Sequence, residues 1–142
     1  MNIKDEALRI AQTYDVTTPK DKLVLFSISF QNNDTNKKLA EEYVKKNSGF
    51  VTIADTPCGK ALEKLQLFAS HSGISQNEAY QIWGIASTRM ILHAKGNITA
   101  FVNGAHPLST FCQYEMPTIL LNPNITTING KSKFCLFAEP WL

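Results

Sequence analysis

The segment Ser109-Thr110-Phe111-Cys112-Gln113-Tyr114-Glu115 ends in a carboxylate and follows a proline-containing loop. Glu115 lies between the apolar residues Tyr114 and Met116, a setting that suits the rim of a site, where loops often carry functional side chains. A carboxylate there can stabilise a cation that develops during a reaction. For an isolated glutamate, the ordinary interpretation is a surface position at the end of a strand.

Trp83 lies on a predicted long helix, and Ser87 follows one turn later on the same face. An indole offers a flat surface for stacking against an aromatic base, and its one N–H donor can orient that base. The same spacing also fits a tryptophan in the core of an amphipathic helix. A site would require this helix to meet the loop before Glu115.

Asp55 ends a predicted short strand, and Thr56 is placed to cap the next helix, with Pro57 at its first position. The carboxylate can bind ribose hydroxyls or an amide, and the helix N-terminus can face a phosphate. Capping alone explains Thr56 equally well. Further candidates for contacts to phosphate and sugar are Ser27, Ser29, Thr110 and the backbone near Phe111. Each also fits ordinary turn chemistry.

The cysteines are Cys58, Cys112 and Cys135, and the histidines are His71, His93 and His106. Three cysteines cannot all pair within one chain, and neither set has the spacing of metal ligands, so we predict a reducing environment and no metal site. The histidines are interpreted as two loop residues and a helix-end charge. Cys58 and Cys112 are interpreted as small buried residues rather than nucleophiles.

The composition predicts one globular domain over residues 1–142. The chain is 44% hydrophobic and 18% charged, which is ordinary for a folded domain with its own core. Its net charge is +2 and its basic residues are scattered, which argues against nucleic-acid binding. The chain opens without an apolar signal core and has no apolar run of membrane length. We expect it to act in a reducing cytosol, without membrane insertion.

Periodicity and capping signals divide the chain into alternating elements. Predicted helices cover residues 3–13, 35–47, 57 onward and 76–96, the last opened by a capping box at Ser75 and Glu78. Predicted strands cover residues 22–30, 50–53, 98–102, 118–121, 125–128 and 134–137, with a hairpin turn at Asn129-Gly130. This order predicts an α/β fold, with helices packed on a small, mostly parallel sheet and a C-terminal hairpin.

Three segments, in this order, resemble the ADP-ribosyl cyclase and cyclic ADP-ribose hydrolase family, animal enzymes that consume NAD. Residues 52–56, Thr-Ile-Ala-Asp-Thr, are similar to the family's Thr-Leu-Glu-Asp-Thr segment. Residues 83–89 resemble its Trp-x-x-x-Ser-x-Arg helix, which bears an active-site tryptophan. Residues 109–115 resemble its Ser-Thr-Phe-x-x-x-Glu segment, which ends in the catalytic glutamate. The likeness spans roughly residues 22–130.

The resemblance implies an ADP-ribosyl cyclase-like fold and cleavage of the bond between nicotinamide and ribose in NAD. It assigns Glu115 and Trp83 to catalysis, and it assigns substrate contacts to Asp55, Ser87, Thr110, Phe111, Ser27 and Thr56. NAD is then the substrate and no cofactor is needed. The small, cysteine-poor chain is expected to be a bacterial relative, an NAD-depleting toxin domain that acts in a target cell and is neutralised by an immunity protein.

The sequence departs from the family in three respects. The tryptophan and arginine that follow the family's first strand are absent here, where Phe26 is followed by Ser-Ile-Ser. The acidic pair is reduced to Ala54-Asp55, and the disulfides are missing. Candidates to replace the absent aromatic residue are Tyr14, Phe30 and Trp141.

Three alternatives stay open beside hydrolysis of NAD. A cyclase would trap the ribosyl cation with adenine instead of water. A catalytically dead relative would bind a nucleotide or a partner without turnover, which the missing tryptophan and arginine would explain. A toxin nuclease, indicated only by the isoelectric point near 8.4, would depend on a histidine and not on Glu115.

Overall fold

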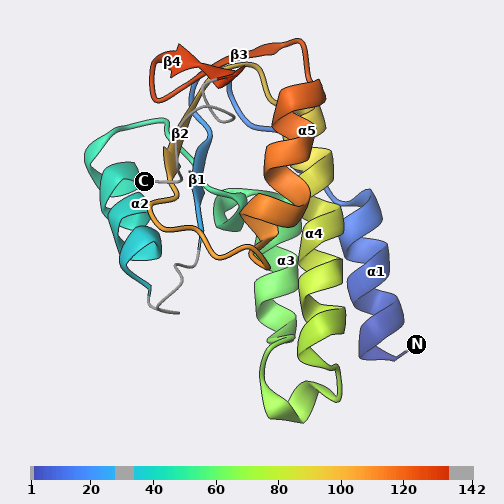
Figure 1. The fold of residues 1–142 in the computed structure, drawn as a ribbon. Coiled ribbons are helices and arrows are strands. Elements are labelled where there is room, and N and C mark those ends of the chain that lie inside the picture. Colours follow the sequence, from blue (N-terminus) through green and yellow to red (C-terminus); the bar gives the residue numbers. More distant parts are fainter. Residues whose placement is uncertain (1, 28–33, 135–142) are drawn as a thin grey trace.

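The computed structural model describes residues 2–27 and 34–134 and contains five α-helices and four strands in that part of the chain (Figure 1). The helices are α1 (Ile3–Thr13), α2 (Thr35–Lys46), α3 (Pro57–Leu65), α4 (Gln76–His93) and α5 (Met116–Leu121). The strands are β1 (Val24–Phe26), β2 (Gly96–Phe101), β3 (Ile125–Ile128) and β4 (Lys131–Ser132). Three short helical turns are η1 (Ile53–Asp55), η2 (Ser70–Ser72) and η3 (Phe111–Glu115).

The strands form one sheet in the order β1-β2-β3-β4. β1 pairs with β2 and β2 pairs with β3 in parallel, whereas β3 and β4 form an antiparallel hairpin. Asn129 and Gly130 both have positive φ angles, of 52° and 79°, as a two-residue type I′ turn requires. The predicted mostly parallel sheet with a terminal hairpin is therefore confirmed.

Helices cover both faces of the sheet (Figure 1). α2 lies against β1 and β2 on one face, while α1, α3, α4 and α5 form the layer on the other. The side chains between sheet and larger helical layer are fully buried and include Leu62, Ile82, Met90, Ile98 and Ile119. Most hydrophobic side chains of this layer thus face a core shared by α3, α4 and β2.

The helix starts follow the capping signals in the sequence. Asn2 accepts from the Asp5 N–H at 2.8 Å, Thr56 accepts from the Gly59 N–H at 3.0 Å, and Ser75 and Glu78 form the predicted capping box. α4 ends at His93 rather than at Gly96, which instead begins β2 with a φ of 80°. A side chain at Gly96 would collide with Asp21, whose carboxylate accepts from the Asn97 N–H.

Two predicted strands are wrong. Residues 50–53 form only a single bridge, between Val51 and Leu23, before the chain enters η1, because Thr52 and Asp55 cap each other there. Residues 118–121 belong to α5, which begins at Met116 and contains Pro117 in its first turn. In the predicted strand at 22–30 only Val24–Phe26 is regular, and residues 28–30 lie outside the described residues.

The strand that pairs with β3 begins directly after the hairpin turn. β4 lies at Lys131–Ser132. Of the strand predicted at 134–137, residues 135–137 lie outside the part of the chain that the structure describes. Lys133 is buried, and its ammonium donates to the carbonyls of Ile119 and Asn122 at the end of α5. This cation thereby caps the helix C-terminus.

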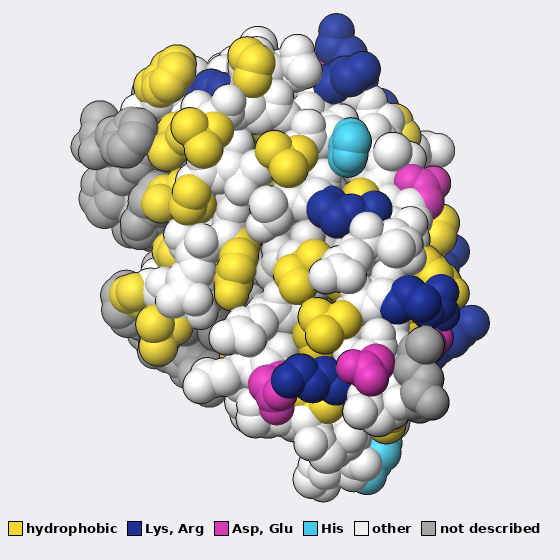
Figure 2. Space-filling model, turned by 90° about the vertical axis from the view of Figure 1, so that its right-hand side faces the viewer, with side chains coloured by type: hydrophobic (Ala, Val, Ile, Leu, Met, Phe, Trp, Pro, Cys, Tyr) yellow, Lys and Arg dark blue, Asp and Glu magenta, His cyan; other side chains and the backbone are white. Residues whose placement is uncertain are grey.

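The outer face of the larger helical layer carries mixed side chains (Figure 2). Basic and acidic groups are scattered over it. Hydrophobic side chains gather on its upper left part. Leu92 of α4 and Leu121 of α5 are among the exposed hydrophobic residues of the described chain. Among residues 2–27 and 34–134, no helix combines the length and apolarity needed to cross a membrane.

Candidate active site

A pocket of about 790 Å³ lies at the carboxyl end of β1. Ligands commonly bind at this edge of a parallel sheet, and the volume is in the range of small-molecule sites. Its walls come from α2, η1, α3, α4 and the turn η3. The buried Asn36 of α2 donates to the carbonyls of Ser27 and Asn103, at 2.9 and 3.0 Å, and so holds α2 beside the ends of β1 and β2.

Glu115 lies in the wall of this pocket and is only 5% exposed. Burial raises the pKa of its carboxyl group to about 7, and a hydrogen bond with Ser87 acts in the opposite direction. No cation forms an ion pair with Glu115 in the described part of the chain. Glu115 therefore lies buried in a helical turn of the pocket wall, and the ordinary interpretation of a surface position at a strand end is wrong for this residue.

The turn that presents Glu115 is a π-helix, in which the Met116 N–H donates to the Phe111 carbonyl. Pro117 has no N–H, so this stretch lacks one donor of a regular α-helix. The Thr118 hydroxyl donates instead to the Tyr114 carbonyl at 2.8 Å. π-turns are rare and are often found at functional sites.

α4 carries a row of pocket residues on one face: Tyr80, Trp83, Ser87 and Met90. Their spacing of three, four and three residues keeps them in line along a helix. Trp83 packs against the hydrophobic core and also lines the pocket. Ser87 is 3% exposed and brings α4 into direct contact with Glu115.

The loop before η3 supplies Ser109, Thr110 and Phe111 to the pocket. Phe111 is fully buried, Thr110 is half-buried, and Ser109 accepts from the Cys112 N–H at 3.2 Å. Ser27 lines the pocket at the end of β1. The structure thus brings together Glu115 and five of the seven other predicted site residues, namely Trp83, Ser87, Thr110, Phe111 and Ser27.

Asp55 and Thr56 do not line the pocket. The Asp55 carboxylate turns back on η1 and accepts from the Thr52 N–H at 2.9 Å, while Thr56 caps α3 and donates to the Ile53 carbonyl at 2.7 Å. Their neighbours Thr52, Ile53 and Ala54 form the wall instead. In this structure both residues therefore shape the wall and do not face the pocket.

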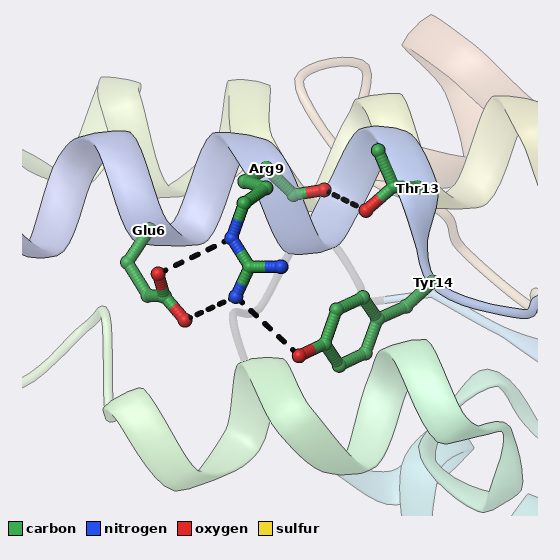
Figure 3. Close-up of polar contacts among 4 residues, drawn as sticks. All are labelled: Glu6, Arg9, Thr13 and Tyr14. Atoms are coloured by element: carbon green, nitrogen blue, oxygen red, sulfur yellow. Dashed lines mark hydrogen bonds and ion pairs between the residues drawn. The ribbon is translucent and has the colours of Figure 1, made fainter.

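Of the three aromatic residues considered as replacements for the missing tryptophan, Tyr14 is the only described one. It lies beside α1, where Arg9 pairs with Glu6 and donates to the Tyr14 hydroxyl at 3.4 Å (Figure 3). Tyr14 does not line the pocket. Phe30 and Trp141, like the candidate Ser29, lie outside the described residues.

Several pocket residues were not recognised in the sequence: Phe26, Lys37, Glu41, Phe68 and Tyr80. Phe68 lies in the connection between α3 and α4, and Tyr80 lies on α4, so only the folded chain brings the two rings together. The predicted helix from residue 57 onward ends at Leu65, so Phe68 lies beyond it. The Phe68 side chain is 44% exposed and lines the pocket, so it is not part of the buried core.

The cysteines and histidines offer no competing chemistry in the described structure. Cys58 is buried and its thiol donates to the Ile10 carbonyl at 3.4 Å, and burial raises the pKa of this thiol. None of the three histidines, all of them described, lines the pocket. No group of three or more potential metal ligands occurs among residues 2–27 and 34–134.

This arrangement, a parallel sheet edge with a buried carboxylate in the pocket wall, defines an α/β fold of the ADP-ribosyl cyclase type. The chain is similar to an Aplysia cyclase solved with substrate NGD and product cGDPR, with 22% identity and a TM-score of 0.57 over 78% of this chain and 48% of that one. It is also similar to porcine CD38 solved with a covalent intermediate, with 18% identity and a TM-score of 0.55 over 91% and 71% of the two chains.

A further CD38 structure, solved to study a conformationally flexible covalent enzyme–substrate complex, matches with 18% identity and a TM-score of 0.58 over 90% of this chain and 59% of that one. This chain spans about half the length of the Aplysia cyclase. No protein-family model matches the sequence, and no curated protein matches it. At these identities the similarity establishes the fold.

Proposed function

We propose that this protein is an NAD glycohydrolase, which releases nicotinamide and ADP-ribose from NAD. The observation that carries the proposal is Glu115, a buried carboxylate that lines the pocket beside Ser87 and Trp83. The cyclase fold supports it, because the solved neighbours act on substrates of this dinucleotide class, such as NGD.

Binding of the substrate would ionise Glu115. Burial keeps the pKa of this carboxyl near 7 despite the opposing hydrogen bond with Ser87, since the charged form is poorly solvated there. The nicotinamide ring of NAD carries a positive charge, and a cation close to a carboxylate lowers its pKa. In the complex with NAD, the Glu115 carboxyl group would therefore be ionised.

In the reaction the glycosidic bond breaks and both electrons go to the nicotinamide nitrogen, so nicotinamide leaves as a neutral molecule. The ribosyl group develops oxocarbenium character, which the Glu115 carboxylate stabilises. Water then adds to the ribosyl carbon, and its proton passes to Glu115 and on to solvent. The scheme has NAD as substrate and requires no cofactor.

The other pocket residues have positioning roles in this scheme. The Trp83 indole stacks on the nicotinamide ring. The Ser87 hydroxyl holds the Glu115 carboxylate. Thr110, Ser27 and the backbone near Phe111 are placed for contacts to ribose and phosphate. Asp55 and Thr56 contribute by holding the wall of η1 and the start of α3.

The deciding experiment measures nicotinamide release from NAD by the purified protein and identifies the second product. Glu115→Gln should abolish release, whereas Glu42→Gln, which removes an exposed carboxylate of α2 outside the pocket, should leave it unchanged. ADP-ribose as product supports hydrolysis, and cyclic ADP-ribose would identify a cyclase. Binding of NAD without release would contradict the mechanism.

A nuclease is the weaker candidate, because no histidine lines the pocket. The expected role as an NAD-depleting toxin domain with an immunity protein stays a prediction, since no contact in the described structure bears on it.

A further inference from the structure

Phe68 and Tyr80 form an aromatic pair at the pocket that core packing does not explain. Their ring centroids are 4.9 Å apart, with an interplanar angle of 64°, an edge-to-face contact. Both rings line the pocket. Phe68 is 44% exposed although its neighbour Leu67 is only 2% exposed. A large apolar ring held at the wall of a pocket is suited to stacking on a ligand.

The backbone reverses its direction just before Phe68, at the end of α3. α3 ends at Leu65, and Gln66 adopts the left-handed conformation with a φ of 50°. A residue other than glycine in this conformation is energetically unfavourable and persists only where the surroundings hold it. The reversal sends Leu67 into the core and leaves Phe68 beside Tyr80.

Tyr80 lies on the same face of α4 as Trp83 and Ser87. Seven residues separate Tyr80 from Ser87, so the backbones of the two are about 10 Å apart along the helix axis. A ribose–diphosphate–ribose chain can bridge such a separation. The reacting end at Glu115 and the aromatic pair therefore lie at two ends of one row.

The charges at the pocket make stacking important for affinity. Lys37 is the only cation among the described lining residues, which also include Glu41, Glu63 and Glu115. The segments outside the described residues, 28–33 and 135–142, contain no lysine or arginine. Because a single lysine is available for a diphosphate, a second base bound to an aromatic surface would supply much of the remaining affinity.

We propose that Phe68 and Tyr80 form a second base-binding subsite, in which the adenine of the dinucleotide stacks while its nicotinamide riboside end lies at Glu115. This inference rests on the proposed function and deepens it, because it assigns the adenine of NAD to a place in the pocket. Loss of the Phe68 ring should weaken binding of the adenine part and leave the chemical step unchanged.

The first test compares NAD with nicotinamide mononucleotide, which lacks adenine, as substrates for nicotinamide release. Phe68→Ala should raise KM for NAD about ten-fold, the usual effect of losing one base–aromatic stack. It should leave kcat for NAD and KM for the mononucleotide unchanged, and Phe68→Trp should restore KM for NAD. Leu39→Ala is the matched control, because Leu39 is also 44% exposed but lies outside the pocket.

The second test is independent of turnover and measures ADP-ribose binding by calorimetry to the same variants. Phe68→Ala should weaken ADP-ribose about ten-fold, while Phe68→Trp and Leu39→Ala retain it. If this pattern holds without any nicotinamide release, the subsite stands and the proposed function fails. If release is normal and Phe68→Ala changes neither ADP-ribose affinity nor KM for NAD, the subsite fails and the proposed function stands. An equal rise in KM for both substrates, or no binding of ADP-ribose by the wild-type protein, would also overturn the subsite.

Discussion

The ring of Tyr114 lies directly against the backbone of Gly84, so that a Cβ atom at Gly84 would come within 2.7 Å of the ring atoms. Gly84 follows Trp83 on α4, and Tyr114 precedes Glu115 in the π-turn. Trp83 and Glu115 are therefore held together by the contact between their chain neighbours, Gly84 and Tyr114. The space left by the absent side chain of Gly84 allows the π-turn to approach α4 closely enough for Ser87 to form a hydrogen bond with Glu115.

Gly84→Ala should lower both stability and nicotinamide release, because the added methyl group must push the Tyr114 ring away. Overpacking of this kind typically costs about 1–3 kcal/mol of the free energy of unfolding. Chemical denaturation and the rate of nicotinamide release measure the two effects. In a Tyr114→Ala background the same substitution should no longer destabilise, because alanine favours a helix over glycine by up to about 1 kcal/mol. Equal losses of unfolding free energy in the wild-type and Tyr114→Ala backgrounds would contradict the close contact between Tyr114 and Gly84.

Nicotinamide release should increase with pH through about 7, because the scheme requires ionised Glu115. The Ser87 hydrogen bond favours the charged form, so Ser87→Ala should raise the pKa of Glu115 and move the rise in kcat/KM to higher pH. The measurement is the pH profile of kcat/KM, which reports the free enzyme. Ser48→Ala, at an exposed serine after α2, should leave the profile in place. A shift to lower pH would contradict this assignment of Ser87.

Buried Glu115 should also make the protein less stable as pH rises. Its carboxyl ionises near 4.5 in the unfolded chain but near 7 in the folded protein, so the folded state holds the extra proton between these values. The favourable contribution is complete below pH 4.5 and is lost as pH rises to about 7, a change of about 3 kcal/mol. Glu115→Gln removes this dependence. Its unfolding free energy relative to wild type should therefore increase from pH 4.5 to pH 7, and a constant difference would contradict the raised pKa.

Arg89 belongs to the segment that resembles an active-site helix, but its guanidinium turns away from the pocket. It donates to the Ala11 and Tyr14 carbonyls at 2.6 and 2.9 Å and so fixes the end of α1 to α4. Arg89→Met should reduce the free energy of unfolding by about 3 kcal/mol, the sum expected for two charge-assisted bonds. KM for NAD should not change at temperatures where the variant is folded. An altered KM with unchanged stability would assign Arg89 to the substrate instead.

Gly59→Ala should destabilise the wall that carries Ala54. A Cβ atom at Gly59 would come within 1.9 Å of the Ile53 carbonyl oxygen, which belongs to η1, so α3 and η1 could not remain packed. We expect a loss of about 1–3 kcal/mol in the free energy of unfolding, measured by denaturation. Lys60→Ala, at the next and exposed position, should have little effect. Equal stability of the two variants would contradict this packing.

The sequence predicts the elements whose signals are local. The caps at Ser75 and Thr56 and the turn at Asn129-Gly130 depend on a few adjacent residues, and all three form as expected. The run at 118–121 was misassigned because a short apolar segment has no clear period, and the effect of Pro117 on the preceding turn depends on its packing.

The family motifs bring some predicted residues to the pocket but not others, since Asp55 and Thr56 do not line it. Glu115, Trp83 and Ser87 meet at the pocket as the motifs imply. Burial of Glu115 requires the contact between Tyr114 and Gly84, which no local pattern indicates. Phe68 reaches the pocket only because the chain reverses at Gln66, a backbone conformation that side-chain periodicity does not record.

The π-turn before α5 makes the orientation of Glu115 depend on the number of residues as well as on their identity. Each residue of an α-helix advances the chain by about 100° around the axis, so one residue more or less redirects every side chain that follows. Deleting the exposed Gln113 would convert the wide turn into an ordinary one and rotate Glu115 out of register with Ser87. Under the proposed mechanism, a related chain with a gap within residues 111–115 should therefore lack activity, even where every recognisable motif letter is retained.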